Sequence, residues 1–473
     1  MAGAPNQSAI NRFTDLVGAA HVLTGGDDMA SYLREWRDKY QGRAAGVLRP
    51  KSVEELQAIV GIANEEGIAL VPQGGNTGLV GAQIAFDAER QFVVNLSRMN
   101  RIRQVDPDGY TMTVEAGVIL KNAQEAAYRV DRLFPLSLGS EGSCQIGGNL
   151  SSNAGGTGVL AYGNARDLTL GLEVVLPSGE VMNELNRLRK NNTGYDLKNL
   201  FIGAEGTLGF ITAAVLKLFS KPRGRQTAFV AFRTLDEVAA FYTSAQAAAG
   251  QMLTAFELMP RIGIEFLVKH IDGARDPIAA AYPWYALLEI SSGQSQDHAE
   301  GLMMSVVGDG METQKVSDGA LAQSEAQNLA FWRLRHELSH CQKPEGGSIK
   351  HDVSVPVATL PAYLREVTDA VLDLIPGCRP VPFGHWGDGN VHFNVSQPVG
   401  EDRETFLNRW EDMNDLVHAI TVDYGGSISA EHGIGVMKRD TLRDVKDPVS
   451  LGLMRQIKET LDPNCIMNPG KVL

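Results

Sequence analysis

A glycine-rich segment places the strongest constraint on how this chain can fold. Residues 135–165 read PLSLGSEGSCQIGGNLSSNAGGTGVLAYGNA and consist largely of glycine, serine and asparagine. A loop of this length inside a compact domain is usually either functional or disordered. The predicted strand at Gly171–Leu176 follows closely, which favours the functional interpretation. Because glycine lets a backbone approach a ligand closely, we expect the domain to be built around a bound molecule.

Two further segments carry clustered glycines. PQGGNTG, residues 72–78, follows a predicted strand at Ile68–Val71, and FIGAEGTLGFIT occupies residues 201–212. Glycines after a strand can turn several backbone N–H groups toward one anion such as a diphosphate. The first segment has no Walker lysine and no G-x-G-x-x-G spacing, so an NAD-type dinucleotide fold loses support. Taken alone, it is equally compatible with a simple turn between strands.

The first part of the chain shows alternating helix and strand signals. Residues 29–40 have the spacing of an amphipathic helix, and so does a segment at 118–130. Another helix is predicted to begin at Ser52, with Glu55 at the capping-box position, and to end at Gly67. Strands are expected at Phe92–Leu96 and Thr111–Glu115.

A basic, proline-containing stretch at residues 221–225 is typical of a domain boundary. After it, Thr234 and Glu237 form a second capping box, and the helix is predicted to end at Gly250. Strands are expected at Ala228–Phe232, 256–258 and 285–290. This second lobe is expected to be a sheet with helices on one side.

The composition of the chain restricts the kinds of binding partner that we expect. The chain has 473 residues, 44% of them hydrophobic, and a formal net charge of -13, which disfavours nucleic acid and anionic lipid. The four cysteines form no C-x-x-C pair, which fits a reducing compartment. The N-terminal stretch MAGAPNQSAINRFTDL has no signal-peptide pattern, and no apolar run is long enough for a transmembrane helix. A cytoplasmic location is therefore expected.

A predicted hairpin at residues 382–395, PFGHWGDGNVHFNV, carries two histidines. Strand alternation places His392 and Asn394 on one face, and His385 across the turn can point the same way. Two imidazoles and a carboxylate make a three-ligand metal site, and Glu431 in SISAEHGIG is the candidate carboxylate. The alternative is that both histidines only form hydrogen bonds within a tight hairpin.

Cationic side chains precede this hairpin. Arg335 and Ser339 are four residues apart in a predicted helix, which places them on one face. Lys350 alternates with apolar residues in SIKHDVSVP, together with Asp352 and Ser354. An isolated arginine or lysine is more often a solvated surface charge.

The three glycine segments, in this order, resemble the FAD-binding domain of the vanillyl-alcohol oxidase, or PCMH-type, flavoprotein family, in the branch of D-2-hydroxyglutarate and D-lactate dehydrogenases. The resemblance covers residues 43–473. It implies an α+β fold, with an FAD-binding domain of two α+β subdomains at 1–220. It also implies a substrate domain at 221–425, with an antiparallel sheet covered by helices, and a segment at 426–473 that packs back on the FAD domain.

The resemblance also implies roles for individual residues. For the diphosphate the matching positions are Gln73, Gly74, Gly75, Asn76, Thr77, Gly78 and Leu79. For the flavin and its linker they are Leu138, Gly139, Ser140, Gly142, Ser143, Gln145, Gly148, Asn149, Ser152, Asn153 and Gly156. For the adenosine end they are Glu205, Gly206, Gly209 and Ile211, and Asn468 lies in the segment that returns to the flavin domain. Some family members bond FAD through a histidine where this chain has Asn76, so a non-covalent flavin is expected.

Within this branch two histidines and a glutamate bind zinc or a similar divalent ion, and the matching positions are His385, His392 and Glu431. Trp386, beside a ligand, departs from the usual aliphatic residue. The positions that contact substrate are Arg335, Ser339, Lys350, Asn394 and His432, with Ser339 replacing a threonine. The resemblance implies hydride transfer to flavin N5, with His432 as the general base.

The implied substrate is a small D-2-hydroxy acid. Lys350 as a second cation beside Arg335 favours D-2-hydroxyglutarate, or D-malate, over D-lactate or glycolate. An electron-transfer flavoprotein, a quinone or a cytochrome is expected as electron acceptor, and a homodimer as the assembly. A zinc hydrolase would also use two histidines and a glutamate, but it leaves the glycine segments unexplained, and a binding module needs no base or metal.

Overall fold

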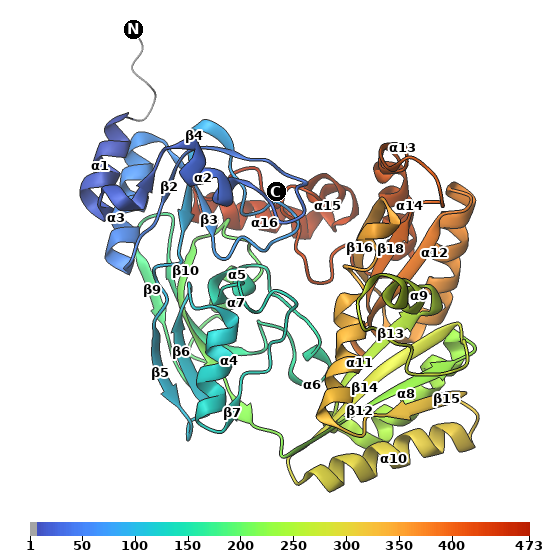
Figure 1. Cartoon of the computed structure of the whole chain (residues 1–473). Helices are drawn as coiled ribbons and strands as arrows, with labels where there is room; N and C mark the ends of the chain where they lie inside the picture. The colour runs from blue at the N-terminus through green and yellow to red at the C-terminus, as the bar shows by residue number, and fades with distance from the viewer. Residues whose placement is uncertain (1–6) are drawn as a thin grey trace. The chain divides into compact units, whose positions relative to one another are not determined.

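The computed structural model describes residues 7–473; the first six residues, part of the stretch considered for a signal sequence, lie outside them. The chain divides into two compact units, which are described separately below. The first comprises residues 1–155, 164–220 and 431–473, and the second comprises 156–163 and 221–430 (Figure 1). The short segment 156–163 and the end at residue 430 distinguish these bounds from the ranges expected above.

The first unit begins with a four-stranded sheet. Its order is β1 (Val22–Leu23), β2 (Arg43–Leu48), β4 (Phe86–Asn95) and β3 (Ala69–Gln73), with β2, β4 and β3 parallel. Two helices, α1 (Gln7–Val17) and α3 (Val53–Glu66), share an apolar core with it.

The capping signals of α3 are confirmed. The Ser52 side chain accepts a hydrogen bond from the Glu55 N–H, and Gly67 ends the helix in the left-handed conformation. The helix expected at residues 29–40 is wrong in its second half. Helix α2 spans only Gly26–Leu33, and Trp36, which lies within the expected helix, is 69% exposed.

A five-stranded antiparallel sheet forms the other half of this unit. Its order is β5 (Ile102–Asp106), β6 (Thr111–Glu115), β10 (Phe210–Lys217), β8 (Thr169–Val175) and β9 (Val181–Glu184). The other elements of this part are α4 (Leu120–Arg129), α5 (Ile146–Ser151), α7 (Lys198–Phe201) and the paired strands β7 (Arg132–Leu133) and β11 (Phe219–Ser220). The short helix α6 (Val159–Tyr162) belongs to the second unit. The glycine-rich segment is therefore ordered, and two short helices interrupt it.

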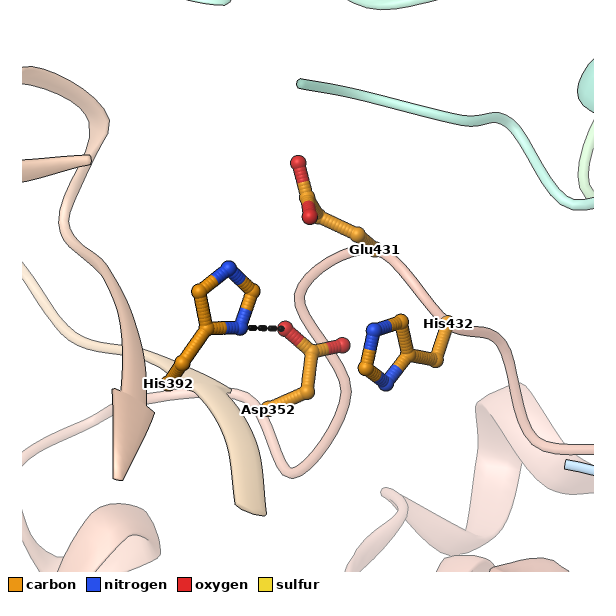
Figure 2. A group of neighbouring side chains, drawn as sticks. All are labelled: Asp352, His392, Glu431 and His432. Carbon is orange, nitrogen blue, oxygen red and sulfur yellow. Dashed lines mark ion pairs between the residues drawn. The ribbon is translucent and has the colours of Figure 1, made fainter. Parts of the chain in front are cut away.

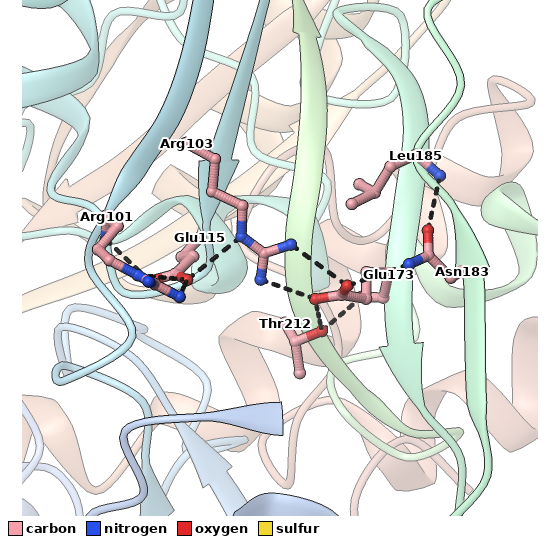
Figure 3. Close-up of polar contacts among 7 residues, drawn as sticks. All are labelled: Arg101, Arg103, Glu115, Glu173, Asn183, Leu185 and Thr212. Atoms are coloured by element: carbon pink, nitrogen blue, oxygen red, sulfur yellow. Dashed lines mark hydrogen bonds and ion pairs between the residues drawn. The ribbon is translucent and has the colours of Figure 1, made fainter. Parts of the chain in front are cut away.

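One face of this sheet carries a row of charges (Figure 3). The guanidinium of Arg103 donates to Glu115 and forms a two-pronged contact with Glu173, at 3.2 and 2.9 Å. Arg101 also donates to Glu115, and Thr212 donates to Glu173 at 2.9 Å. Burial raises the pKa of Glu115, but its bonds to the two arginines and to a backbone N–H outweigh that effect, so the pKa is lowered. A cleft of about 390 Å³ lies along this row.

The C-terminal segment belongs to the first unit. It contains α15 (Arg439–Val445) and α16 (Pro448–Leu461). Its end lies beside β3, because the Leu70 N–H donates to the Ile466 carbonyl and the Asn468 N–H donates to the Leu70 carbonyl. The Glu205 carboxylate accepts two further backbone N–H groups, from Ile434 at 2.7 Å and Gly435 at 2.8 Å.

The second unit is built on a seven-stranded antiparallel sheet. Its order is β15 (Asp318–Leu321), β12 (Gly224–Phe232), β14 (Trp284–Ser292), β13 (Leu253–Pro260), β17 (Arg379–His385), β18 (Asn390–Ser396) and β16 (Ser348–Ser354). One face packs against α8 (Leu235–Ala249), α10 (Gln296–Glu312), α12 (Leu360–Leu374) and α14 (Trp410–Asp423). The short α13 (Arg403–Leu407) precedes α14.

The opposite face packs against α9 (Arg261–His270) and α11 (Glu325–Glu337), through Phe229, Tyr285 and Phe383 among others. Helices therefore cover parts of both faces, and the expectation of helices on one side only is wrong. The reason is that β13 and β14 are buried on both faces along most of their length, a pattern that strand alternation does not reveal. Within residues 7–473, no helix is both long enough and apolar enough to span a membrane.

Candidate functional site

The first glycine loop and the long glycine-rich segment lie against each other in the first unit. A Cβ atom on Gly75 would lie 2.1 Å from the Ser143 carbonyl oxygen, which is far inside van der Waals contact. A Cβ on Gly74 would lie 3.4 Å from Oε1 of Gln145. Only glycine permits this approach of backbone to backbone. The two predicted cofactor segments are thus adjacent, although 60 or more residues separate them in the sequence.

The same segment has an open side. A Cβ on Gly139, Gly142 or Gly148 would meet no protein atom within 4 Å. Nearby, Gln145 Oε1 and Asn149 Nδ2 are buried and have no hydrogen-bond partner among residues 7–473; Oδ1 of Asn468, in the same unit, is buried and unbonded too. Buried polar atoms are normally satisfied, so these atoms fit a polar ligand such as an isoalloxazine ring with its N–H and C=O groups.

Asn76 and Gln73 hold the first loop in place. The Asn76 amide donates to the carbonyls of Ser31 and Arg34, and the Gln73 amide donates to those of Tyr32 and Gln83. Because its amide is bonded to protein, Asn76 acts as a brace for the loop. Non-covalent attachment of the flavin stays a prediction.

The third segment is bonded mainly to protein. Burial raises the pKa of Glu205 to about 7, although the N–H groups of Ile434 and Gly435 partly oppose the shift. A Cβ on Gly206 would lie 2.7 Å from Pro72, so this glycine lets the segment pack on β3. Asn153 accepts a hydrogen bond from the Arg166 N–H, and Gly156 belongs to the second unit. Contact of these residues with the adenosine end or the flavin stays a prediction.

In the second unit, the hairpin of β17 and β18 pairs with β16 to align the predicted polar residues. Lys350 lies directly opposite Asn394, and Asp352 lies directly opposite His392. All four alternate with Ile349, Val353 and other core residues, so they share the sheet face that α9 and α11 partly cover. His392 Nδ1 lies 3.7 Å from Asp352 Oδ1.

A group of metal-binding side chains forms at this point. Asp352, His392, Glu431 and His432 each offer a ligand atom, and these atoms lie within 4.8 Å of one another (Figure 2). Glu431 and His432 directly follow Ala430, whose N–H donates to the Asp352 carbonyl at 3.3 Å, so the covalent chain keeps them close to β16. Two imidazoles and two carboxylates suit a divalent ion such as zinc.

Of the predicted triad, His392 and Glu431 are in this group and His385 is not. The rings of His385 and His392 have centroids 5.6 Å apart. His385 Nδ1 lies 2.6 Å from Oε1 of Glu257, a carboxylate that also accepts a hydrogen bond from Nε of Arg335 at 2.6 Å. Burial raises the pKa of Glu257, but Arg335 and His385 outweigh it and lower that pKa to about 2.

The substrate residues come together in part. Lys350 Nζ donates to the Ser339 carbonyl at 3.2 Å. Helix α11 ends at Glu337, so the expectation that Arg335 and Ser339 share one helical face is wrong. Ser339 lies in the turn beyond the helix, where its position depends on the following loop.

Sequence reasoning assigned no role in the site to two residues. Asp352 was placed in alternation with Lys350, but nothing in that pattern identified it as a candidate metal ligand. Glu257 lies in a strand that is buried throughout, and only the register of β13 with β17 places it opposite His385. No local pattern predicts such a pairing.

Comparison with known proteins gives consistent matches. Residues 44–183 match the family described as "FAD binding domain", and residues 221–472 match "FAD linked oxidases, C-terminal domain". The chain is 35% identical over 459 residues to D-2-hydroxyglutarate–pyruvate transhydrogenase of Saccharomyces cerevisiae, covering 94% of this chain and 90% of that protein. It is 36% identical to D-2-hydroxyglutarate dehydrogenase of Xanthomonas citri, covering 96% and 95%.

A third relative, a putative mitochondrial D-lactate dehydrogenase of Schizosaccharomyces pombe, is 34% identical and covers 98% of this chain and 88% of that protein. Among solved structures, p-cresol methylhydroxylase superposes with a TM-score of 0.78 at 18% identity, covering 100% of this chain and 97% of that one. This likeness confirms the expected α+β fold. Together with the glycine loops described above, the matches show that this chain belongs to the family of FAD-linked oxidases with a PCMH-type FAD-binding domain.

Proposed function

We propose that this protein is an FAD- and divalent-metal-dependent dehydrogenase that oxidises a D-2-hydroxy acid, with D-2-hydroxyglutarate as its preferred substrate. The observation that carries the proposal is the single sheet face that gathers Lys350, Asn394 and His392, with Arg335 nearby on α11. Full-length relatives named for D-2-hydroxyglutarate support the same substrate.

A dicarboxylate requires two cationic contacts. Arg335 can hold one carboxylate through paired N–H donors, and Lys350 offers a point charge for the other. The Lys350 ammonium donates to the Ser339 carbonyl, and Lys350 lies opposite Asn394 in the strand register. A monocarboxylate such as D-lactate leaves one of these cations without a partner.

The reaction divides between the bound groups and the chain. The chemistry that the bound groups supply is hydride acceptance at flavin N5 and polarisation of the substrate hydroxyl by a divalent ion. Arg335 and Lys350 orient the substrate, and Asn394 contributes an amide to the same face. His432 then takes the hydroxyl proton as general base, a role suited to an imidazole near neutral pH.

For the metal we propose His385, His392 and Glu431 as ligands. His392 and Glu431 are within the 4.8 Å group, and the His385 ring adjoins His392. Asp352 is the competing third ligand. The metal content of the His385→Ala and Asp352→Asn proteins distinguishes them, because removal of a ligand should lower the metal stoichiometry more than removal of a neighbouring side chain.

D-Lactate, glycolate or D-malate oxidation is the second candidate, supported by the relative named as a putative D-lactate dehydrogenase. A zinc hydrolase stays a remote candidate, because a hydrolase would have no use for the FAD-binding domain. The non-covalent attachment of FAD, the electron acceptor (an electron-transfer flavoprotein, a quinone or a cytochrome), the homodimer and the cytoplasmic location all stay predictions.

The decisive experiment is an anaerobic titration of the purified protein with D-2-hydroxyglutarate, followed by the visible absorption of the flavin. Rapid bleaching by this acid and weak bleaching by D-lactate is the expected result. Bleaching by D-lactate alone would move the proposal to the second candidate. A flavin that no 2-hydroxy acid bleaches would refute the activity while leaving the family assignment intact.

A further inference from the structure

The carboxylate of Glu257 occupies the middle of the seven-stranded sheet. Its side chain is 1% exposed, and it lies on β13 directly opposite His385 on β17. Two donors from different elements converge on it: Nε of Arg335 on α11 and Nδ1 of His385, each at 2.6 Å. Replacing a buried ion pair by apolar residues of similar volume is often neutral or stabilising. Stability alone therefore does not explain this arrangement.

The contact determines which nitrogen of His385 can bind a ligand. A carboxylate paired with an arginine, which stays protonated, can only accept, so His385 Nδ1 carries the proton. When the ring is neutral, the lone pair lies on Nε2, at the opposite edge of the ring. Metal-bound histidines commonly use this arrangement, in which a carboxylate behind the ring fixes tautomer and orientation.

The same contact determines which edge of Arg335 is available. Nε makes the only hydrogen bond of this guanidinium within residues 7–473, and the Phe383 ring lies 5.0 Å from its Cζ atom. Anchored at Nε and supported by the aromatic ring, the guanidinium keeps the four N–H groups of its Nη atoms for another partner. Such a planar edge suits bidentate binding of a carboxylate.

We propose that Glu257 is a positioning residue that orients the substrate-binding arginine and the metal-binding histidine through one shared carboxylate. The inference rests on the proposed function, because it takes Arg335 as a substrate contact and His385 as a metal ligand. It adds that Arg335 and His385 are coupled. Removal of the Glu257 carboxylate impairs metal binding and substrate binding together, although Glu257 itself is not proposed to contact the metal or the substrate.

Glu257→Gln tests this because glutamine keeps the volume and loses one acceptor. Its carbonyl oxygen can satisfy His385 or Arg335, and its NH₂ group then faces the other donor. If the amide turns its NH₂ group to His385, Nδ1 becomes the acceptor and the proton moves to Nε2, where it blocks the metal. We expect metal affinity to fall about 10- to 100-fold, as for other residues behind metal ligands. The KM for D-2-hydroxyglutarate should rise, with the flavin retained.

The measurements are chelator competition on the FAD-loaded protein, which reads metal affinity without turnover, and steady-state kinetics. Glu289→Gln is the matched control. Glu289 lies on β14 of the same sheet and accepts a hydrogen bond from Trp332 Nε1 on α11, so it supports the same helix without touching Arg335 or His385. This control should leave metal affinity and KM unchanged.

A double variant separates positioning from general damage. In a His385→Ala background, Glu257→Gln should not lower metal affinity further, because the ring that it orients is gone. Full additivity of the two losses would overturn the proposal, and so would a single variant that matches the unaltered protein in both measurements. If the glutamine variant does not retain flavin, Glu257→Asp replaces it. The shorter side chain can reach only one donor, so it should impair one measurement, and loss of neither again overturns the proposal.

Measurements on the unaltered protein distinguish failure of the proposed function from failure of the positioning role of Glu257. If it binds no divalent metal and D-2-hydroxyglutarate does not bleach its flavin, the proposed function fails, and the roles assigned to Glu257 fail with it. If both are normal and only the variants disagree with expectation, the positioning role fails by itself.

Discussion

Gly75 and Gly148 are both predicted to contact the cofactor, yet the structure gives them opposite surroundings. A Cβ on Gly75 would lie 2.1 Å from a backbone carbonyl oxygen, and a Cβ on Gly148 would meet nothing within 4 Å. Alanine at position 75 must therefore push two loops apart. Alanine at position 148 enters open space that we assign to the flavin. The two substitutions add the same methyl group and should have different consequences.

For Gly75→Ala, overpacking costs about 1–3 kcal/mol, which lowers the melting temperature of a unit of this size by roughly 2–12 °C. This loss should appear in the flavin-free protein. For Gly148→Ala, the position is exposed within helix α5, where alanine is favoured over glycine by about 0.4–1 kcal/mol. The flavin-free variant should melt no lower than the unaltered protein. Its Kd for FAD should rise, however, by about 5- to 150-fold for the same 1–3 kcal/mol of overpacking.

The assay is thermal unfolding of flavin-free protein by circular dichroism, paired with FAD titration by fluorescence. An unchanged Kd for Gly148→Ala would show that the open side of the segment does not face the cofactor. An unchanged melting temperature for Gly75→Ala would show that the two loops are not in contact. Either result refutes the reasoning from glycine geometry, independently of the enzyme's substrate.

Four further expectations concern other parts of the molecule. Lys350→Ala should reduce kcat/KM for D-2-hydroxyglutarate far more than for D-lactate, and equal losses in steady-state assays would contradict the dicarboxylate assignment. His432→Ala should keep the flavin spectrum and remove most anaerobic reduction; rapid bleaching of that variant would exclude the base assignment. Arg103→Ala should destabilise the first unit by about 3 kcal/mol in urea unfolding, because it leaves the buried carboxylate of Glu173 without its cation; a variant as stable as the parent would mean that the row contributes nothing. Glu345 is buried, which raises its pKa, but His270, Lys269 and Arg379 outweigh this and hold the pKa at about 2. Its stabilisation is therefore present above the ordinary carboxyl pKa of about 4.3 and is lost as the pH falls toward 2, so Glu345→Gln should be less stable at pH 7 and should lose less stability on acidification than the parent.

Local signals in the sequence were sufficient for elements whose ends are chemically marked. The caps at Ser52 and Thr234 and the C-terminal glycine at 67 were predicted correctly, because each is a bond between residues three or four apart. The helix at 29–40 was extended too far, because Trp36 and Tyr40 have helical spacing although the chain leaves the helix after Leu33. The spacing of apolar residues alone does not indicate where a helix ends when no capping residue marks its end.

The residues of the candidate site likewise fall into those that local sequence signals predict and those that they do not. Strand alternation correctly placed His392 and Asn394 on one face, but nothing in the pattern identified Asp352 as a candidate metal ligand. The position of Glu257 could not be inferred, because it depends on strands β13 and β17, more than a hundred residues apart in sequence, pairing in one register. The covered second face of that sheet has the same cause, since only tertiary packing decides which apolar strand face receives a helix.

The row of charges on the five-stranded sheet has a consequence for how that sheet assembles. Arg103, Glu115, Thr212, Glu173 and Asn183 come one from each strand, and they are joined in a continuous line. If one strand shifted by one residue, its polar side chain in this row would point toward the apolar core. A charged side chain on the neighbouring strand would then be left without a partner. Apolar residues on this face would be compatible with several strand alignments, whereas the hydrogen bonds of this row form in only one alignment. The row of charges therefore favours the native strand alignment over the shifted alignments that the apolar pattern alone would permit.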